Sequence, residues 1–255
     1  MRQEPPEIDY ILIGNGRMAQ HIMHYFKLLN LNIAQWSRSK NCQSKQSFGI
    51  STIRLSKISQ VSELPNIPIL IAISDDSIPE IVNEVTQLTN APLIHFSGAL
   101  SSEKLNGKAF SMHPLYTFNY EPMSLTEYEK IPFTCEPDGP DFKTIFPSLI
   151  NPHVKIPNSN RRLYHSLACM ASNLPAMIWT QCAEISADNL NLDWKLYQPL
   201  VEQTLRNAFS APQDCITGPI IRGDWNLVDA QLEVLPKGTA TKMYELAARN
   251  SKETQ

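Results

Sequence analysis

The sequence predicts an α/β protein in which an N-terminal Rossmann-type parallel sheet is followed by a C-terminal all-α domain. An apolar run near the N-terminus ends in a glycine turn, and further apolar runs alternate with helical patterns up to about residue 157. Beyond that point helical periodicity continues without strands. We therefore expect a Rossmann dinucleotide-binding domain over residues 1–157 and a helical substrate or dimerisation domain over residues 158–255.

The first predicted element, residues 8–20, combines a buried strand, a glycine turn and the start of a helix. Gly14, Gly16 and Ala19 have the G-x-G-x-x-A spacing of the dinucleotide-binding fingerprint. Glycine permits the tight turn and the close approach of a pyrophosphate, and the free N–H groups of the helix attract phosphate. An ordinary strand-to-helix turn is the alternative interpretation. The cofactor-binding prediction for this turn covers Gly14, Asn15, Gly16, Arg17 and Met18.

The second strand is predicted over Ile33–Trp36, and its end is where an acidic residue would bind the ribose hydroxyls of NAD. This sequence has Ser37, Arg38 and Ser39 there instead, followed by Lys40. Basic and hydroxyl side chains attract a 2′-phosphate, whereas a carboxylate would repel it. The pattern favours NADP over NAD, with Arg38 as the phosphate ligand. A solvated basic loop is the alternative.

Further strands are predicted over residues 50–55, 67–73 and 92–96, and the strand at 67–73 is followed by a helix that has Pro79 in its first turn. Ligands bind beyond the carboxyl ends of parallel strands, so the residues that follow these strands should share one crevice with the glycine turn. The predicted cofactor contacts here are Ser74, Asp75, Ser97 and Gly98. Asp75 and Asp76 also fit a helix cap, and Ser97 a turn.

Residues 112–130 are interpreted as a connection that carries His113 and Tyr116. Strands are predicted at 131–135 and 154–156, flanking a short helix at 142–149, and residues 157–160 form the domain boundary. A long helix over 161–186 then places six apolar residues on one face, which should form the core of the domain: Leu163, Leu167, Met170, Leu174, Met177 and Ile178.

The opposite face of this long helix carries His165 and Cys169, with Asn173 at its flank. Pro175 should kink the helix or split it. Three more helices are predicted at 193–209, 224–235 and 239–250. The segment TGPIIRGD at 217–224 separates the first two, with Asp224 as a cap.

Composition excludes several classes of protein. The 255 residues carry a net charge of −3 and a pI near 6.1, which gives no reason to expect nucleic acid or an anionic membrane as a partner. We expect no signal peptide, because MRQEPPE lacks an apolar core, and no membrane span. Five widely spaced cysteines suit reduced thiols in a cytoplasm. The scattered histidines show no metal-ligand spacing, so we expect no metal.

Several stretches together resemble an uncharacterised bacterial family that joins a Rossmann-like NADP-binding domain to a helical domain of unknown function. They are GNGRMA, LIHFSGA, HPLYTF, YHSLACMASN and TGPIIRGD, and the resemblance runs from about residue 8 to 248. The family is similar to phosphogluconate dehydrogenase-like, pyrroline-carboxylate reductase-like and ketopantoate reductase-like enzymes. This resemblance implies a homodimer formed through the helical domain and an active site between the domains.

The resemblance also implies a lysine on the long helix with an asparagine about one turn later. Here that stretch offers His165 and Asn173, and no lysine lies between Lys155 and Lys195. Either His165 supplies the proton or the catalysis is altered or lost. The sequence therefore leaves two hypotheses open, an oxidoreductase or a non-catalytic NADP-binding protein whose helical domain is a dimer or partner surface.

The favoured hypothesis is NADPH-dependent reduction of a small carbonyl or imine substrate in the cleft between the domains. The product needs a proton near neutral pH, which histidine can supply. The candidate proton donors are His165 and then His113, with Asn173 as a hydrogen-bond partner of the substrate. Arg222 is the candidate ligand for a substrate carboxylate.

Overall fold

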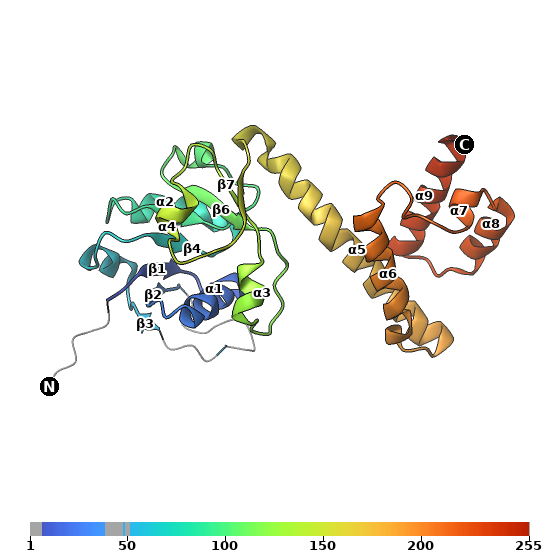
Figure 1. The fold of residues 1–255 in the computed structure, drawn as a ribbon, viewed down its shortest axis with the longest axis horizontal. Helices are drawn as coiled ribbons and strands as arrows, with labels where there is room; N and C mark the ends of the chain where they lie inside the picture. Colours follow the sequence, from blue (N-terminus) through green and yellow to red (C-terminus); the bar gives the residue numbers. More distant parts are fainter. Residues whose placement is uncertain (1–6, 39–47, 49–51, 255) are drawn as a thin grey trace. The chain divides into compact units, whose positions relative to one another are not determined.

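The computed structural model of the protein describes residues 7–38, 48 and 52–254 and divides into two compact units. Met1–Ala168 contains the sheet, and Cys169–Gln255 is helical (Figure 1). The division falls inside the longest helix, α5 (Arg161–Leu190), so this one helix contributes residues to both units.

Eight strands in the described part of the chain form one sheet in the order β3-β2-β1-β4-β5-β6-β7-β8. The fold class predicted from the sequence is confirmed. The strands are β1 (Tyr10–Ile13), β2 (Ile33–Trp36), β3 (Ile53–Arg54), β4 (Ile69–Ile71), β5 (Leu93–His95), β6 (Phe110–Pro114), β7 (Phe133–Cys135) and β8 (His153–Lys155).

The sheet departs from the predicted parallel arrangement at one pair, because β6 and β7 are antiparallel. The chain between them contains only one short helix, α3 (Leu125–Glu129), which packs beside α1 (Arg17–Leu28). A connection that does not cross the sheet returns the chain from the end at which β6 stops, and this gives an antiparallel neighbour.

Residues 112–130 are therefore not a bare connection, as the sequence interpretation had it. They contain the end of β6 and the whole of α3, which Ser124 and Glu127 begin as a capping box. The S-x-x-E spacing was a signal for this helix. The strand assignment matters more for function, because it fixes His113 in the sheet.

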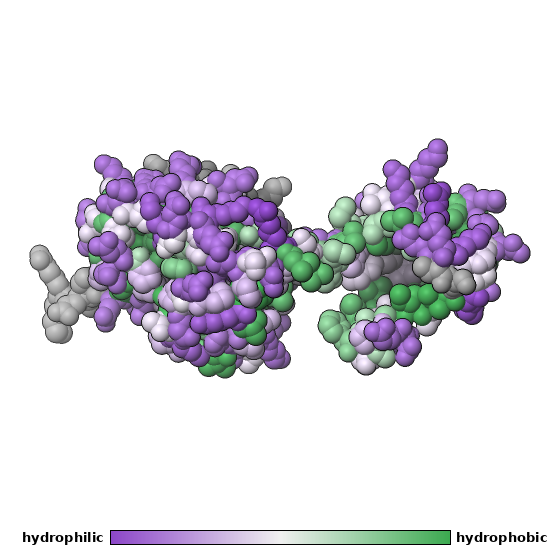
Figure 2. Space-filling view, turned by 90° about the horizontal axis from the view of Figure 1, so that it is seen from above, coloured by the Kyte–Doolittle hydropathy of each residue, from purple (hydrophilic) through white to green (hydrophobic). Residues whose placement is uncertain are grey.

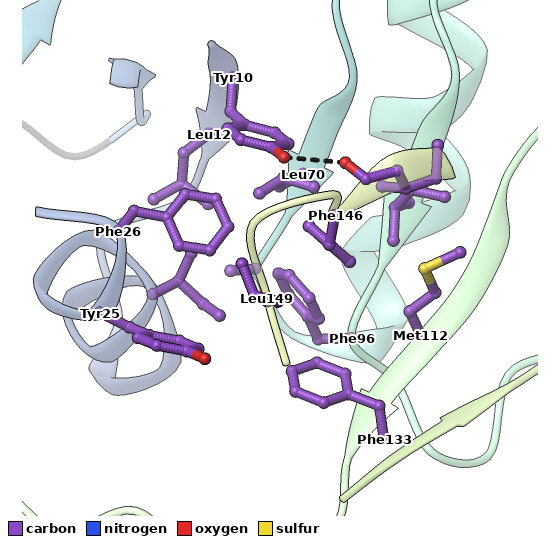
Figure 3. Packing of buried hydrophobic residues seen from close by; sticks show 14 of the residues in the cluster. Tyr10, Leu12, Tyr25, Phe26, Leu70, Phe96, Met112, Phe133, Phe146 and Leu149 are labelled. Atoms are coloured by element: carbon purple, nitrogen blue, oxygen red, sulfur yellow. Dashed lines mark hydrogen bonds between the residues drawn. The ribbon is translucent and has the colours of Figure 1, made fainter. Parts of the chain in front are cut away.

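Side chains alternate between the two faces of the sheet, as strand geometry requires. Tyr10 and Leu12 face a core shared with α1, α3 and α4 (Phe142–Ile145). Ile11 and Ile13 face the core formed with α2 (Ile78–Val85). Figure 3 shows the first core, where the Tyr10 hydroxyl donates a hydrogen bond of 2.8 Å to the carbonyl oxygen of Ile145.

The helical unit contains the rest of α5, then α6 (Gln198–Ser210), α7 (Pro219–Arg222), α8 (Trp225–Val234) and α9 (Thr239–Thr254). The helices α7, α8 and α9 pack together and bury Val228 and Ala248. Pro175 does not split α5, which continues through it as one helix. None of the described helices is long and apolar enough to cross a membrane.

The apolar face predicted on α5 exists, but it does not form a core in the single chain. Leu163, Leu167, Met170 and Met177 are 54–63% exposed. Helical periodicity identifies an apolar face without identifying what covers it, and here the chain itself leaves these side chains open to solvent.

Candidate cofactor and proton-donor site

The glycine turn after β1 has the geometry that its sequence predicts. Gly14 has a φ of +132°, and a Cβ atom placed there would lie 2.2 Å from the carbonyl oxygen of Ala72. Only glycine fits this position. Gln35 fixes the turn by donating a hydrogen bond of 2.8 Å to the Gly14 carbonyl oxygen.

Gly16 differs from Gly14, because a Cβ atom added there would meet no other atom within 4 Å. The fold does not require glycine at this position, and the missing side chain leaves open space directly before α1. The first turn of α1 carries no acidic residue and no side-chain cap. Its free N–H groups and the positive end of the helix dipole are thus open to an anion.

A cavity of about 540 Å³ lies at this edge of the sheet. It brings together the residues that follow β1, β2, β4 and β5, as expected for the carboxyl ends of parallel strands. Ten of the twelve predicted cofactor contacts line it: Gly14, Asn15, Gly16, Arg17, Met18, Ser37, Arg38, Ser74, Asp75 and Ser97. Of the other two, Gly98 follows Ser97 but does not line the cavity, and Ser39 lies outside the described residues.

The part of the cavity that follows β2 is lined by Trp36, Ser37 and Arg38, with no carboxylate at the end of the strand. The Arg38 guanidinium forms an ion pair of 2.6 Å with Glu80, and both side chains are more than half exposed. An exposed pair of this kind is weak, so an anion of higher charge can compete for Arg38.

Asp75 and Ser97 connect the ends of β4 and β5. The Ser97 hydroxyl donates a hydrogen bond of 2.6 Å to the Asp75 carboxylate and accepts one of 3.0 Å from the Leu100 amide. Neither Ser74 nor Ser77 caps the following helix through its side chain. The Asp75 carboxylate therefore orients Ser97 at the rim of the cavity.

Arg17 extends from the first turn of α1 to the connection that follows β6. Its guanidinium donates a hydrogen bond of 3.0 Å to the Phe118 carbonyl oxygen and lies 4.1 Å from the centre of the Tyr120 ring. These contacts attach the β6–α3 connection to the wall of the cavity.

Two predicted proton donors, His113 and His165, meet beside Gly98. Their ring centres are 5.8 Å apart. A Cβ atom on Gly98 would lie 2.5 Å from His165 Nδ1 and 3.1 Å from His113 Nε2. Glycine provides space here, because a Cβ atom would collide with the His165 imidazole and crowd that of His113.

The sequence interpretation missed two residues of this cluster, Arg161 and Tyr164. The Tyr164 hydroxyl lies 2.7 Å from His113 Nδ1. Arg161 is fully buried in the first turn of α5 and donates hydrogen bonds to the Ser97 carbonyl oxygen, at 3.1 Å, and to Ser111 Oγ. An arginine at the start of a helix normally reaches solvent, so only the fold identifies this one as buried.

The charge of Arg161 is balanced by Glu136, which is also buried, with 3.8 Å between Nε and the carboxylate. The same carboxylate accepts a hydrogen bond from the Ser102 amide. Arg161 thus attaches the start of α5 to the end of β5 and the start of β6, and it holds the segment that carries Tyr164 and His165 in place.

The other two predicted site residues lie in the helical unit. Asn173 is exposed on α5. Arg222 ends α7 and forms an exposed ion pair of 2.9 Å with Asp224. Asp224 precedes α8, but its carboxylate contacts Arg222 and does not cap the helix. In the part of the chain that the structure describes, no group of three or more potential ligands could hold a metal ion.

The parallel core, the glycine turn and the cavity at the carboxyl edge define a Rossmann-type fold followed by a helical region. Residues 135–251 match the family described as "Domain of unknown function (DUF2520)". The sequence-based resemblance to an uncharacterised family of this architecture, similar in fold to known reductases, is confirmed. A search of curated proteins gave no match.

Solved structures share the fold over almost the whole chain. A Bacteroides fragilis protein provisionally described as an NADP oxidoreductase has 20% identity and a TM-score of 0.80, with 97% of this chain and 98% of that chain covered. A Thermotoga maritima protein has 21% identity and a TM-score of 0.65, covering 96% and 97%. The NADP-bound pyrroline carboxylate reductase of Plasmodium falciparum has 14% identity and a TM-score of 0.60, covering 97% and 99%.

Proposed function

We propose that the protein is an NADP(H)-dependent oxidoreductase that reduces a small carbonyl or imine substrate. The observation that carries this proposal is the cavity at the carboxyl edge of the sheet, with open space at Gly16 and Arg38 in place of an acidic residue. The fold relatives include an imine reductase from Streptomyces aurantiacus and a reductive aminase from Aspergillus terreus in complex with NADPH, which supports this class of reaction.

The residues around the cavity fit the parts of NADP. The amides after Gly14 and Gly16 suit the diphosphate, and Ser37 and Arg38 suit the 2′-phosphate, for which Ser39 remains a sequence-based prediction. The nicotinamide end would then lie toward Ser97 and Gly98. When bound, reduced nicotinamide supplies a hydride. The protein itself must orient the substrate, exclude water and supply a proton.

His113 and His165 are the proposed proton donors, because both imidazoles converge beside Gly98, next to the rim of the cavity. Asn173 and Arg222 remain predicted substrate ligands in the helical unit. We assign the predicted helical domain, residues 158–255, to substrate binding and dimerisation.

A homodimer is part of the proposal, because the helical unit exposes large apolar side chains that the single chain leaves uncovered. Figure 2 shows hydrophobic surface on this unit, and Leu196, Leu200 and Phe209 are 65%, 66% and 87% exposed. Exposed apolar surface of this extent marks an association site. Sedimentation velocity should give a dimer, and a monomer at micromolar concentration would contradict this part. We also propose a cytoplasmic location, which fits the observation that the four described cysteines form no disulfide bonds.

Calorimetry with Arg38→Ala tests the cofactor assignment. The variant should bind NADPH at least tenfold more weakly and leave NADH binding nearly unchanged, because only NADPH carries the 2′-phosphate. Arg249→Ala is the matched control, since Arg249 is also exposed and forms an ion pair, with Glu245. Equal losses for both nucleotides would remove the case for NADP.

A metabolite screen that follows NADPH absorbance tests for catalysis. His165→Ala should reduce any turnover while leaving NADPH affinity intact. NADPH binding without turnover of any carbonyl or imine would favour the alternative, a non-catalytic NADP-binding protein, which the missing lysine between Lys155 and Lys195 also supports.

A further inference from the structure

His113 and Tyr164 form a contact that neither the glycine fingerprint nor the family resemblance assigns. His113 lies near the end of β6, and Tyr164 lies in the first turn of α5. The phenol hydroxyl is 2.7 Å from His113 Nδ1, and the two rings meet edge to face at 80°, with their centres 5.7 Å apart. The burial of Arg161 fixes this turn of the helix.

The imidazole of His113 is neutral at physiological pH. Burial, followed by the nearby charges of His165 and Arg161, lowers its pKa to about 4. His95, buried on the neighbouring strand β5, and Tyr164 are the other titratable groups that interact with it or contact it. A neutral imidazole has one nitrogen that donates a hydrogen bond and one that accepts. The nitrogen that carries the proton decides what His113 can do.

Tyr164 favours one of the two tautomers. A phenol hydroxyl is a good hydrogen-bond donor, and the unprotonated nitrogen of a neutral imidazole is a good acceptor. Burial raises the pKa of Tyr164, and a hydrogen bond with Thr134 lowers it. The phenol thus keeps its proton at neutral pH and can donate it to Nδ1, which leaves the His113 proton on Nε2.

The Nε2 edge of His113 faces the backbone of Gly98. A Cβ atom on Gly98 would lie 3.1 Å from both Nε2 and Cε1. Ser97, the preceding residue, lines the cavity at the carboxyl end of β5. A proton on Nε2 is therefore on the edge of the ring that faces the end of β5, where a substrate carbonyl or imine would lie.

We propose that Tyr164 is a positioning residue that holds His113 as the Nε2–H tautomer, so that a neutral N–H faces the substrate. The reaction of this site rests on the proposed function, whereas the tautomer itself is a property of the protein without cofactor. The neutral N–H would donate a hydrogen bond to the substrate oxygen or nitrogen as negative charge develops on it.

Nitrogen-15 NMR of the histidine-labelled, cofactor-free protein tests the tautomer directly. His113→Gln assigns the His113 signals among the six histidines. In the wild type, Nε2 should have the shift of a protonated ring nitrogen and Nδ1 that of an unprotonated one. Tyr164→Phe should populate the other tautomer. Tyr197→Phe is the matched control in the helical unit and should leave the His113 signals unchanged.

Kinetics and binding then separate this proposal from the proposed function. Tyr164→Phe should lower kcat tenfold or more in the proposed reduction and change the affinity for NADPH less than twofold. A protonated Nδ1 in the wild type, or an unchanged tautomer in Tyr164→Phe, would overturn the positioning role. Failure to bind NADPH would overturn the proposed function and leave the tautomer result in place.

Discussion

The two glycines of the turn after β1 should respond in opposite ways to the same substitution. Gly14→Ala adds a methyl group 2.2 Å from the backbone oxygen of Ala72, at a φ of +132°. Backbone strain of this kind costs about 1–3 kcal/mol, and an overpacked contact costs about 1–3 kcal/mol more. The variant should lose about 2–6 kcal/mol of unfolding free energy, a large part of a typical stability of about 5–15 kcal/mol.

Gly16→Ala should affect binding and leave the fold nearly intact. The added methyl group meets no protein atom within 4 Å, and the φ of −71° is open to any residue. Alanine is a poorer N-cap than glycine, and this costs about 0.5–1 kcal/mol. The same methyl group would occupy the space before the free amides of α1. NADPH affinity should fall more than tenfold, equivalent to about 1.4 kcal/mol.

Urea unfolding and calorimetry on both variants and the wild type provide the measurement. Each variant is the control for the other, since both replace glycine by alanine within three residues of the chain. Wild-type stability in Gly14→Ala would contradict the geometry of the turn. Wild-type NADPH affinity in Gly16→Ala would show that this open space does not hold the diphosphate.

Three further substitutions test the charges of the site. Glu80→Gln should tighten NADPH binding by up to about fivefold in calorimetry and leave NADH binding unchanged, because it frees Arg38 from an ion pair worth about 0.2–1 kcal/mol. Unchanged NADPH affinity would mean that Glu80 does not compete with the cofactor for Arg38. Arg161→Met should lower the free energy of unfolding in urea by about 3–5 kcal/mol, because it leaves the Glu136 carboxylate without its charged partner. Adding Glu136→Gln should recover part of this loss, and a larger loss in the double variant would contradict the pairing. Since the pKa of folded His113 is about 4 against an ordinary 6.5, the unfolded chain takes up a proton that the folded chain excludes. His113 alone should lower stability by about 3 kcal/mol as the pH drops from 6.5 to 4, and buried His95, with a pKa of about 3, adds to the fall; His113→Gln should remove only the His113 share in urea titrations.

Local patterns predicted the part of the cavity that follows β1, β2 and β4. Each of these strands is a short apolar run that ends in turn residues, and the rule for parallel sheets places those ends together. The second strand, Ile33–Trp36, has the predicted bounds. The sequence predicted a role for each glycine, but not that only Gly14 is required by the fold, because it does not reveal that the Ala72 carbonyl lies against Gly14.

The proton-donor cluster could not be predicted as a cluster, because its members come from three distant segments. Phe110–Pro114 alternates apolar and polar residues as a strand does, but the run is short and a proline ends it, so its strand signal is weak. Those polar side chains belong there because they contact other buried polar groups, Ser97 and Tyr164. Pairings of this kind depend on the tertiary fold and leave no periodic signal.

The first turn of α5 offers a physical reason why this chain can lack the lysine that its resemblance implies. Arg161 cannot exchange protons at neutral pH, and its guanidinium is used in the contacts with Ser97 and Glu136 that fix the start of the helix. Under the proposed function the transferred proton is then assigned to His165, and His113 contributes a hydrogen bond from its neutral N–H. A neutral N–H on His113 can approach a carbonyl or a cationic iminium, whereas an ammonium group would repel the iminium. The position of that proton requires Tyr164, because without a donor at Nδ1 nothing in the contact would keep the proton on the edge that faces Gly98.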